Sequence, residues 1–384
     1  MTATVQRFIA RNGATATLYL GDNTEVLKMI AGCHACVTDP PYSYKFMGRR
    51  WDYELPTVAQ WALVLAALLP GAHLLSAGGP RTYHRLTCGI EDAGFDVRDC
   101  IMHIFGSGFP KSKNLGNGIG SNLKPAYEPW TLARKPCEGT LEKNYAEHGT
   151  GGLNIDASRI GTEQVRTHIG PLLRYSGQNS RPGHASIKKD HADHTGRWPA
   201  NLLLSYPEDE YAEDGTLLPN PEKEEVLDAF AKFGERKSGG SDGSRGIRSS
   251  KSMSGVLGAR TDIGGMGPNT GSAARFFFCA KSSKADRGNY TKSALPLFGV
   301  EEETFTNSHI TIKPLALMRY LCKLVTPPGG TVLDSWMGSG STGVAALKEG
   351  FSFIGIERDL ESFRIACERM RQEAGETQPA EERE

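Results

Sequence analysis

The sequence predicts an α/β fold in which both ends of the chain build one parallel sheet, and three observations support this prediction. Short apolar runs typical of strands alternate with helical segments up to about residue 135. The pattern then stops, because residues from about 136 to 304 are rich in Gly, Ser, Asn and charge. It returns from about residue 305, so we expect residues 136–304 to be an insertion between residues 1–135 and 305–384 of a single α/β domain.

Residues 1–135 contain strand and helix patterns in alternation. Thr57–Leu69 is almost entirely apolar and predicts a buried helix, which Pro70 and Gly71 should end. In chain order, we expect a strand at Thr15–Leu20, a helix at Asp22–Ile30 with Val26, Leu27 and Ile30 on one face, a strand at His34–Thr38, the helix at Thr57–Leu69, a strand at Ala72–Ser76, a helix at Pro80–Ala93, and strands at Phe95–Phe105 and Tyr127–Ala133.

Residues 305–384 return to the same alternation. We expect a helix at Pro314–Leu324, a strand at Thr331–Asp334, a helix at Thr342–Glu349 and a strand at Phe353–Glu357. The last 14 residues are polar and predict a frayed tail.

The composition excludes several classes of protein. Among 384 residues, Lys and Arg total 44 and Asp and Glu total 44, so the whole surface cannot coat an acidic polymer. A local basic region is present, because residues 231–290 hold 11 Lys and Arg against 4 Asp and Glu. No run of about 18 apolar residues predicts a membrane span, and the N-terminus lacks the apolar core of a signal peptide. Eight Cys are too few for a disulfide scaffold of this length, which favours a reduced, cytoplasmic setting.

A Gly-rich loop, Asp334–Gly343 (DSWMGSGSTG), lies between a predicted strand and a predicted helix. Small residues in this setting let a ligand approach backbone N–H groups. Glu357 follows Asp334 by 23 residues, close to the spacing at which an acid binds ribose hydroxyls in nucleotide-binding folds. No Lys follows the glycines, which argues against a nucleoside triphosphate. The loop residues expected at the ligand are Asp334, Trp336, Gly338, Ser339, Gly340, Ser341 and Thr342.

A second motif, Asp39-Pro40-Pro41-Tyr42, follows the strand at His34–Thr38. The two prolines have no N–H, so their carbonyls are free to accept hydrogen bonds from a ligand. Asp39 adds a carboxylate that only accepts when ionised, and Tyr42 adds a flat aromatic face. This set suits an exocyclic amino group on a planar base, although a Pro-rich turn with a capping Asp would give the same four letters.

VTDPPY followed by DSWMGSGST resembles the amino-methyltransferases of DNA that use S-adenosylmethionine. Because the DPPY motif comes first and the Gly-rich loop last, the chain resembles the permuted β group of that family, and YEPWTLARKP, GLNID and GRWPANLLLS resemble its phage and prophage members. The resemblance implies a Rossmann-like methyltransferase sheet, circularly permuted, with a target-recognition region inserted at 136–304. It also implies catalytic roles for Asp39, Pro40, Pro41 and Tyr42.

Three further segments carry the resemblance to the cofactor site. His309–Pro314 (HITIKP) is similar to the family's H-P-x-x-K-P segment, and Leu20–Asp22 is similar to a strand-end acid near the cofactor adenine. The resemblance therefore implies cofactor contacts at Asp22, Asp39, His309, Lys313 and Glu357 as well as in the loop. The sequence departs from the family pattern at two places: Ser335-Trp336 replaces the usual Pro-Phe, and Ile310 replaces the first Pro. Because Trp336 stands in the place of the Phe, we expect its ring to stack on adenine.

The resemblance implies methyl transfer to an amine of a base flipped out of double-stranded DNA. Asp rather than Ser before Pro-Pro-Tyr favours adenine N6, and cytosine N4 remains the alternative. RNA or protein-amide methyltransferases more often have Asn at position 39, and a DNA-binding module without activity would not need both motifs. Whether the chain forms a homodimer, or has a cognate restriction endonuclease or none, stays open. DNA contacts are expected at Lys45, Arg49, Arg50, Arg245, Arg248 and Lys251.

Metal ions are not expected. Cys33-His-Ala-Cys36 is a lone C-x-x-C without a second pair, and its strand leads into the DPPY motif. Pro136-Cys137 resembles the nucleophile dipeptide of cytosine-C5 methyltransferases but lies outside both motifs.

Overall fold

The computed structural model describes residues 4–44, 52–105, 112–169, 190–205 and 312–375, together with short strands at 210–211, 217–218, 278–279, 289–292 and 303–306. The chain divides into two compact units. The larger comprises Met1–Ser158, Ala200–Glu224 and Phe278–Glu384, and the smaller comprises Arg159–Pro199 and Glu225–Phe277. None of the helices in the described residues is long and apolar enough to cross a membrane.

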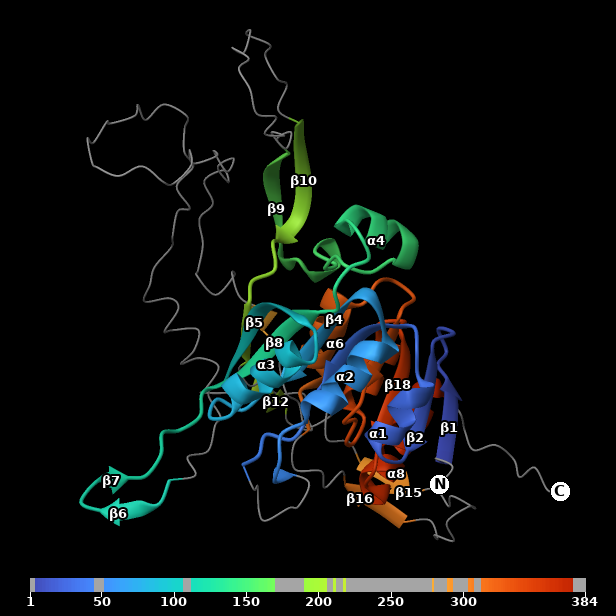
Figure 1. Cartoon of the computed structure of the whole chain (residues 1–384). Coiled ribbons are helices and arrows are strands. Elements are labelled where there is room, and N and C mark those ends of the chain that lie inside the picture. The colour runs from blue at the N-terminus through green and yellow to red at the C-terminus, as the bar shows by residue number, and fades with distance from the viewer. Residues whose placement is uncertain are drawn as a thin grey trace, which may run out of the picture. The chain divides into compact units, whose positions relative to one another are not determined.

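A ten-stranded sheet forms the centre of the larger unit, in the order β1-β2-β18-β17-β3-β4-β8-β5-β11-β14 (Figure 1). All its pairs are parallel except those made by β1 and β8. The strands are β1 (Thr4–Ile9), β2 (Thr15–Leu20), β3 (Cys33–Thr38), β4 (Leu68–Ala77), β5 (Asp96–Phe105), β8 (Tyr127–Arg134), β11 (Leu202–Ser205), β14 (Phe278–Cys279), β17 (Thr331–Asp334) and β18 (Ser352–Glu357).

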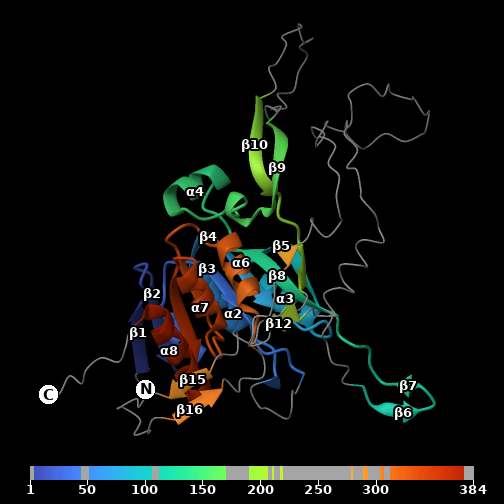
Figure 2. The same ribbon diagram turned by 180° about the vertical axis from the view of Figure 1, so that it is seen from behind.

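Helices cover both faces of this sheet. They are α1 (Asn23–Val26), α2 (Val58–Ala67), α3 (Tyr83–Asp92), α6 (Leu315–Val325), α7 (Ser341–Lys348) and α8 (Leu360–Ala374). Helix α4 (Leu141–His148) instead contacts the start of β4, where Asn144 donates to the Pro70 carbonyl. Figure 1 shows α1, α2 and α3 in front of the sheet, and Figure 2 shows α6, α7 and α8 on the opposite face.

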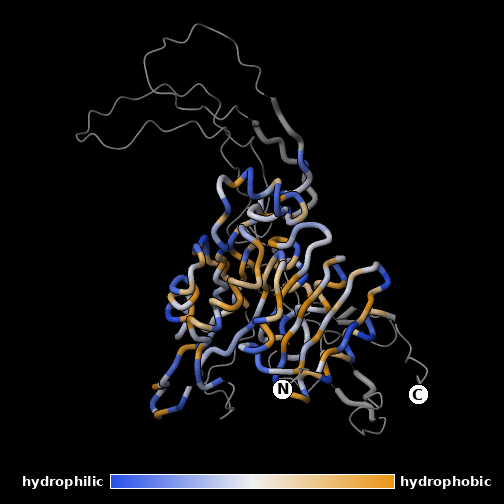
Figure 3. Tube along the Cα trace, turned by 45° about the vertical axis from the view of Figure 1, so that its right-hand side comes forward, coloured by the Kyte–Doolittle hydropathy of each residue, from blue (hydrophilic) through white to orange (hydrophobic). Residues whose placement is uncertain are grey.

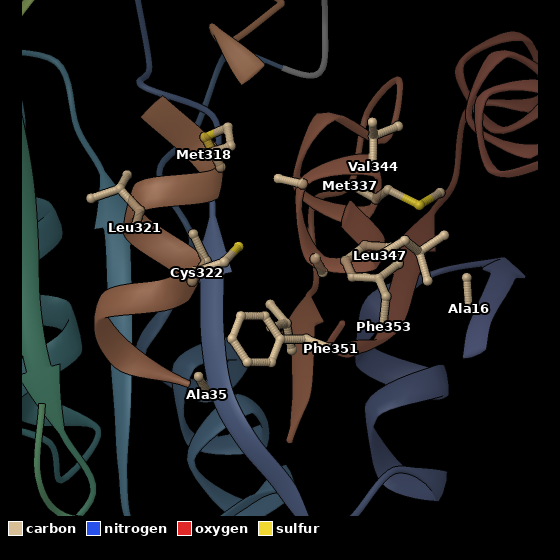
Figure 4. Packing of buried hydrophobic residues seen from close by; sticks show 14 of the residues in the cluster. Ala16, Ala35, Met318, Leu321, Cys322, Met337, Val344, Leu347, Phe351 and Phe353 are labelled. Carbon is tan, nitrogen blue, oxygen red and sulfur yellow. The ribbon is translucent and has the colours of Figure 1, made fainter. Parts of the chain in front are cut away.

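Two apolar clusters hold these layers together. Side chains alternate between the faces of a strand, so Ala35 and Val37 of β3 pack with α6, α7 and α8, whereas Cys36 packs with α1, α2 and α3. Figure 4 shows the first cluster, where Met318 and Leu321 of α6 lie over the sheet. In Figure 3 the apolar segments gather in the strands between the helical layers. The sequence-based prediction of an α/β fold is therefore confirmed.

The sheet is mixed rather than purely parallel, because β8 runs antiparallel to both β4 and β5. The residues between β5 and β8 include a small hairpin, β6 (Asn114–Gly116) and β7 (Ile119–Gly120), and no helix among those described. Without a crossover helix the chain re-enters the sheet in the opposite direction.

The helix predicted at Thr57–Leu69 ends two residues early, at Ala67. The helix begins where it was predicted, and Thr57 is its N-cap in a capping box with Gln60. Leu68 instead begins β4, because it is buried and pairs with Cys33 of β3. Pro70 and Gly71 then lie at a register shift between β3 and β4, where Pro needs no ladder hydrogen bond.

Several elements were not predicted, among them β1, α4, β11 and α8. Helix α8 has the clearest signal, an Asp359 N-cap followed by the buried residues Phe363, Ala366, Cys367 and Met370 at helical spacing. The first residues of the expected tail, 371–374, instead belong to α8, which continues to the buried Ala374.

The compact units do not follow the predicted boundaries at 135 and 304. Residues 136–158, which include α4, belong to the larger unit, and β11 extends the central sheet beside β5. The larger unit also contains the two-stranded sheets β12 (Glu210–Tyr211) with β13 (Leu217–Leu218) and β15 (Asn289–Lys292) with β16 (Glu303–Thr306). The smaller unit contains the antiparallel hairpin of β9 (Ile160–Ile169) and β10 (Asp190–Arg197). A role in target recognition stays a prediction.

Candidate active site

A cavity of about 730 Å³ lies at the carboxyl ends of β2, β3, β17 and β18, where parallel strands end at one edge of the sheet. Most of the predicted cofactor residues line it: Asp22, Asp39, Lys313, Asp334, Trp336, Gly338, Ser339, Ser341, Thr342 and Glu357. Pro41 lines it as well, whereas Pro40 is buried and is not among the lining residues. The two motifs predicted from the sequence thus meet at one cavity.

Asp334 joins three elements at the base of the cavity. Its Oδ1 accepts hydrogen bonds from the Thr38 hydroxyl at 2.6 Å and the Trp336 N–H at 3.1 Å, and its Oδ2 accepts one from the Thr342 hydroxyl at 2.6 Å. Only 1% of Asp334 is exposed, and burial raises its pKa to about 6 despite these hydrogen bonds. Asp334 therefore fixes the end of β3 to the start of the Gly-rich loop.

Glu357 fixes the same loop from β18. Its Oε2 accepts from the Gly338 N–H at 2.8 Å, and its Oε1 accepts from the N–H groups of Arg358 and Asp359 at 2.9 and 2.8 Å. Burial raises the pKa of this carboxyl group. A carboxylate oxygen accepts more than one hydrogen bond, so Glu357 retains capacity for hydroxyl groups in the cavity.

Gly340 does not line the cavity, contrary to the expectation that it faces the ligand. Its φ of +80° is in the left-handed region, and a Cβ there would lie 3.0 Å from the Cβ of Ala366 on α8. Glycine is therefore required by the turn and by the close approach of α8.

Arg369 of α8 supports the loop from behind, and sequence reasoning missed it. Its Nη1 donates to the Ser339 carbonyl at 2.8 Å and to the Ser341 hydroxyl at 3.0 Å, and only 4% of the residue is exposed. A buried Arg is rare without partners, so its position on the apolar face of the unpredicted helix α8 was the available signal.

Asp22, Asn23 and Trp336 line the side of the cavity next to the end of β2. Asp22 is the N-cap of α1 and accepts from the Thr24 N–H at 2.8 Å. Asn23 donates to the Ser335 carbonyl at 3.1 Å. The Trp336 ring lies against Trp61 of α2, with ring centroids 4.9 Å apart, and still lines the cavity. An aromatic face for a planar ligand is therefore present.

Asp39 lies in a network of four polar side chains. Its Oδ1 accepts from the Tyr42 hydroxyl at 2.6 Å, and its Oδ2 lies 3.2 Å from the Lys313 Nζ. The same Nζ lies 2.5 Å from Glu128 Oε1, which is also 2.9 Å from the Tyr42 hydroxyl. Glu128, on β8, was not singled out from the sequence. Lys313 thus lines the cavity and also contacts the carboxylates of both Asp39 and Glu128.

The backbone of the DPPY motif is held at its last residue, Tyr42. The Tyr42 N–H donates to Asp52 Oδ1 at 2.8 Å, and the Tyr42 carbonyl accepts from the Thr82 hydroxyl at 2.7 Å. The Tyr42 ring makes an edge contact with Tyr44, with centroids 6.0 Å apart. The hydrogen bonds of the Tyr42 hydroxyl and backbone therefore fix the orientation of its ring, whose face is predicted to contact a base.

Some predicted residues lie outside the described part of the chain. These are His309, Lys45, Arg49, Arg50, Arg245, Arg248 and Lys251. Cys33 and Cys36 are buried in β3, and burial raises the pKa of both thiols.

The charge of the cavity points to the kind of ligand. Two cations line it, Lys313 and Arg358, against seven carboxyl groups: Asp22, Asp39, Glu54, Asp334, Glu357, Asp359 and Glu361. This excess of carboxyl groups favours a ligand that carries positive charge. The Trp336 ring and the Glu357 carboxylate suit a nucleoside. S-adenosylmethionine, which combines a sulfonium and an ammonium with adenosine, fits these residues.

The fold and the cavity define a Rossmann-like enzyme that binds a nucleoside cofactor. Residues 33–368 match the family model of N6/N4 DNA methylases (N6_N4_Mtase, DNA methylase). The chain therefore belongs to this DNA methylase family, which confirms the family identified from the two motifs and, with it, S-adenosylmethionine as the cofactor.

Similarity to individual proteins is local. The chain is 59% identical to the type II methyltransferase M.BglI of Bacillus subtilis over 53 residues, which cover 14% of this chain and 15% of that protein. It is 38% identical to M2.DpnII of Streptococcus pneumoniae over 71 residues, covering 18% and 26%. The solved structure of M1.HpyAVI in complex with SAM aligns over 92% of this chain and 98% of that chain, at 16% identity and a TM-score of 0.41.

Proposed function

We propose that the chain transfers a methyl group from S-adenosylmethionine to the exocyclic N6 of adenine at specific sites in double-stranded DNA. The observation that supports this most directly is that Asp39 of the DPPY motif and Glu357 of the nucleoside site line one cavity. One motif supplies acceptors for an amine, and the other supplies a place for the methyl donor.

On this proposal the residues of the Gly-rich loop and β18 hold the cofactor. The Glu357 carboxylate accepts from ribose hydroxyls, and the Trp336 ring contacts the adenine. The excess of carboxyl groups in the cavity favours the positive charges of the ligand. When bound, the cofactor supplies a methyl group activated by a sulfonium.

Asp39 and the Pro40 carbonyl accept the two hydrogens of the target amine. The lone pair of that amine is delocalised into the ring, so orienting both hydrogens toward acceptors lets the nitrogen pyramidalise and attack. The Asp39 carboxylate also stabilises the positive charge that develops on the nitrogen. No covalent intermediate with the protein is required.

The amine is stacked inside duplex DNA, so the base has to leave the helix, and Tyr42 is the aromatic residue that would contact it. Lys45, Arg49 and Arg50 follow Tyr42 directly and suit phosphate contacts next to the flipped nucleotide. Arg245, Arg248 and Lys251 belong to the net positive stretch of residues 231–290 and suit neutralisation of the DNA backbone.

Cytosine N4 is the second candidate. Its amine satisfies the same acceptors, and the family includes both activities. The Asp at position 39, rather than Ser, is the feature that favours adenine.

One experiment separates these functions. The protein is incubated with methyl-labelled cofactor and unmethylated duplex DNA, the DNA is digested to nucleosides, and the labelled product is identified. We expect label in N6-methyladenine. Label in N4-methylcytosine alone would overturn the adenine assignment, and no label in DNA would overturn the function.

Asp39→Ala is the matched test of the mechanism. Loss of an oriented, charged acceptor lowers turnover by about 10²–10³ in comparable sites. Calorimetry should show that the cofactor still binds, because Glu357 and Trp336 are unchanged. Glu25→Gln removes an exposed carboxylate of α1 that pairs with Lys28 and serves as the control. Equal turnover in Asp39→Ala and Glu25→Gln would refute the role of Asp39.

A further inference from the structure

Two carboxylates share one ammonium and one phenol hydroxyl beside the cavity. Asp39 comes from the end of β3, Glu128 from β8, Tyr42 from the DPPY motif and Lys313 from the segment before α6. The exposed fractions of the side chains are 22% for Asp39 and 14% for both Glu128 and Lys313. The charges of these three groups are therefore only partly screened by water.

The lysine is closer to Glu128 than to Asp39. Its Nζ lies 2.5 Å from Glu128 Oε1 and 3.2 Å from Asp39 Oδ2. Glu128 Oε2 also accepts from the Trp130 indole N–H at 3.2 Å, and His103 Nδ1 lies 4.0 Å from it. Glu128 therefore has a fixed orientation in which its charge faces the ammonium.

The four groups carry a net charge of one negative unit when Lys313 is protonated and both carboxyls are ionised. The two carboxylates raise the pKa of Lys313 in spite of burial, which keeps it an ammonium. The Lys313 ammonium also holds the pKa of Glu128 at about 2, so Glu128 stays ionised. Burial raises the pKa of Asp39; the charge of Lys313 lowers it and the charge of Glu128 raises it, and the net direction is upward.

We propose that Glu128 is a positioning residue for methyl transfer: it shares the charge of Lys313 with Asp39, so the cluster keeps a net negative charge in front of the target amine. This inference rests on the proposed function. Without Glu128, Lys313 would pair with Asp39 alone and would occupy the carboxylate that has to accept the amine. The developing positive charge on the amine would then face an ion pair of zero net charge instead of a net negative group.

Three variants of nearly unchanged shape test this idea. Glu128→Gln brings the net charge of the cluster to zero, and Lys313→Met brings it to two negative units. The double variant returns it to one negative unit, as in the wild type. If net charge is what matters, the double variant is more active than Glu128→Gln alone, whereas purely structural losses would add.

Steady-state kinetics on duplex DNA gives the first readout. We expect Glu128→Gln to lower kcat by about 10- to 100-fold, with the KM for the cofactor within about twofold of the wild type. The double variant should recover at least about tenfold of that loss. Thermal unfolding and calorimetry with the cofactor establish that each variant is folded and binds.

The acid limb of the kcat–pH profile gives a readout that a structural role would not shift. Activity rises with pH as Asp39 ionises, and the groups that face Asp39 are Tyr42, Glu128, Lys313 and, through its charge, Asp334. Removing the anion Glu128 lowers the pKa of Asp39, so the limb moves to lower pH in Glu128→Gln. Removing the cation Lys313 moves it to higher pH, and the double variant returns it toward the wild type.

Two outcomes overturn the inference while the proposed function stands. In the first outcome, the wild type methylates DNA and the kcat of Glu128→Gln lies within about twofold of the wild-type kcat. The other is a double variant less active than both single variants, with no opposite movement of the acid limbs. Absence of methyl transfer by the wild-type protein would instead overturn the proposed function.

Discussion

Asp334 provides a test of whether burial outweighs hydrogen bonding in setting the pKa of a carboxyl group, because its charge is buried and Asp334→Asn keeps its shape. The carboxylate is 1% exposed and accepts three hydrogen bonds, from Thr38, Thr342 and the Trp336 N–H. Burial nevertheless dominates and raises its pKa from 3.8 to about 6. Asp334→Asn keeps Oδ1 for two of the donors, and the Thr342 hydroxyl can rotate to accept from the new amide.

The size of the expected effect follows from that pKa. Because the pKa of Asp334 in the folded protein is above its unfolded value, its contribution to stability is fully present below about pH 4 and is lost as the pH rises through about 6. A shift of about 2 pKa units corresponds to about 3 kcal/mol over the whole range. Between pH 5 and pH 8 the wild type loses about 1.4 kcal/mol through this group.

The assay is urea unfolding of the wild type and Asp334→Asn at pH 5 and pH 8. All other titrating groups are shared, and those that do not interact with the charge of Asp334 cancel in the difference between the two proteins. We expect the stability of Asp334→Asn relative to the wild type to rise by about 1.4 kcal/mol from pH 5 to pH 8. A pH-independent difference, or a difference that falls with pH, would refute the conclusion that burial outweighs the three hydrogen bonds.

The position of both motifs at one cavity could be predicted from the sequence. Asp39 and Asp334 each follow an apolar run, and the carboxyl ends of parallel strands lie at the same edge of a sheet. The local patterns place each motif at the end of a strand, and the structure adds that β3 and β17 are direct neighbours. Helix α8 could also have been predicted from the sequence, since its apolar residues repeat at helical spacing.

The partners of these motif residues could not be predicted. Glu128 and Lys313 are 185 positions apart in the chain, and their contact depends on β8 entering the sheet antiparallel. An apolar run does not reveal the direction of a strand or its neighbours. Arg369 was hidden for a related reason, because its bonds to Ser339 and Ser341 depend on how α8 packs behind the loop.

The remaining predictions concern the cofactor, the loop and the DNA. Glu357→Ala should weaken cofactor binding by about 1.5–3 kcal/mol in calorimetry, the range for a charged hydrogen bond, and unchanged affinity would contradict the nucleoside site. Gly340→Ala should lower the free energy of unfolding by about 1–3 kcal/mol, because its φ is +80° and its new Cβ would approach α8; equal stability in urea would contradict this. The exposed Lys113 and Lys124 flank the β6–β7 hairpin in the connection from β5. Strand β5 runs parallel to β4, which places this connection at the edge of the sheet where the cavity lies. If duplex DNA covers that edge, changing both lysines to Gln should reduce the log–log salt slope of binding by up to about 1.8, since each phosphate contact contributes about 0.9. An unchanged slope in the double variant would mean that DNA reaches the cavity without touching this hairpin.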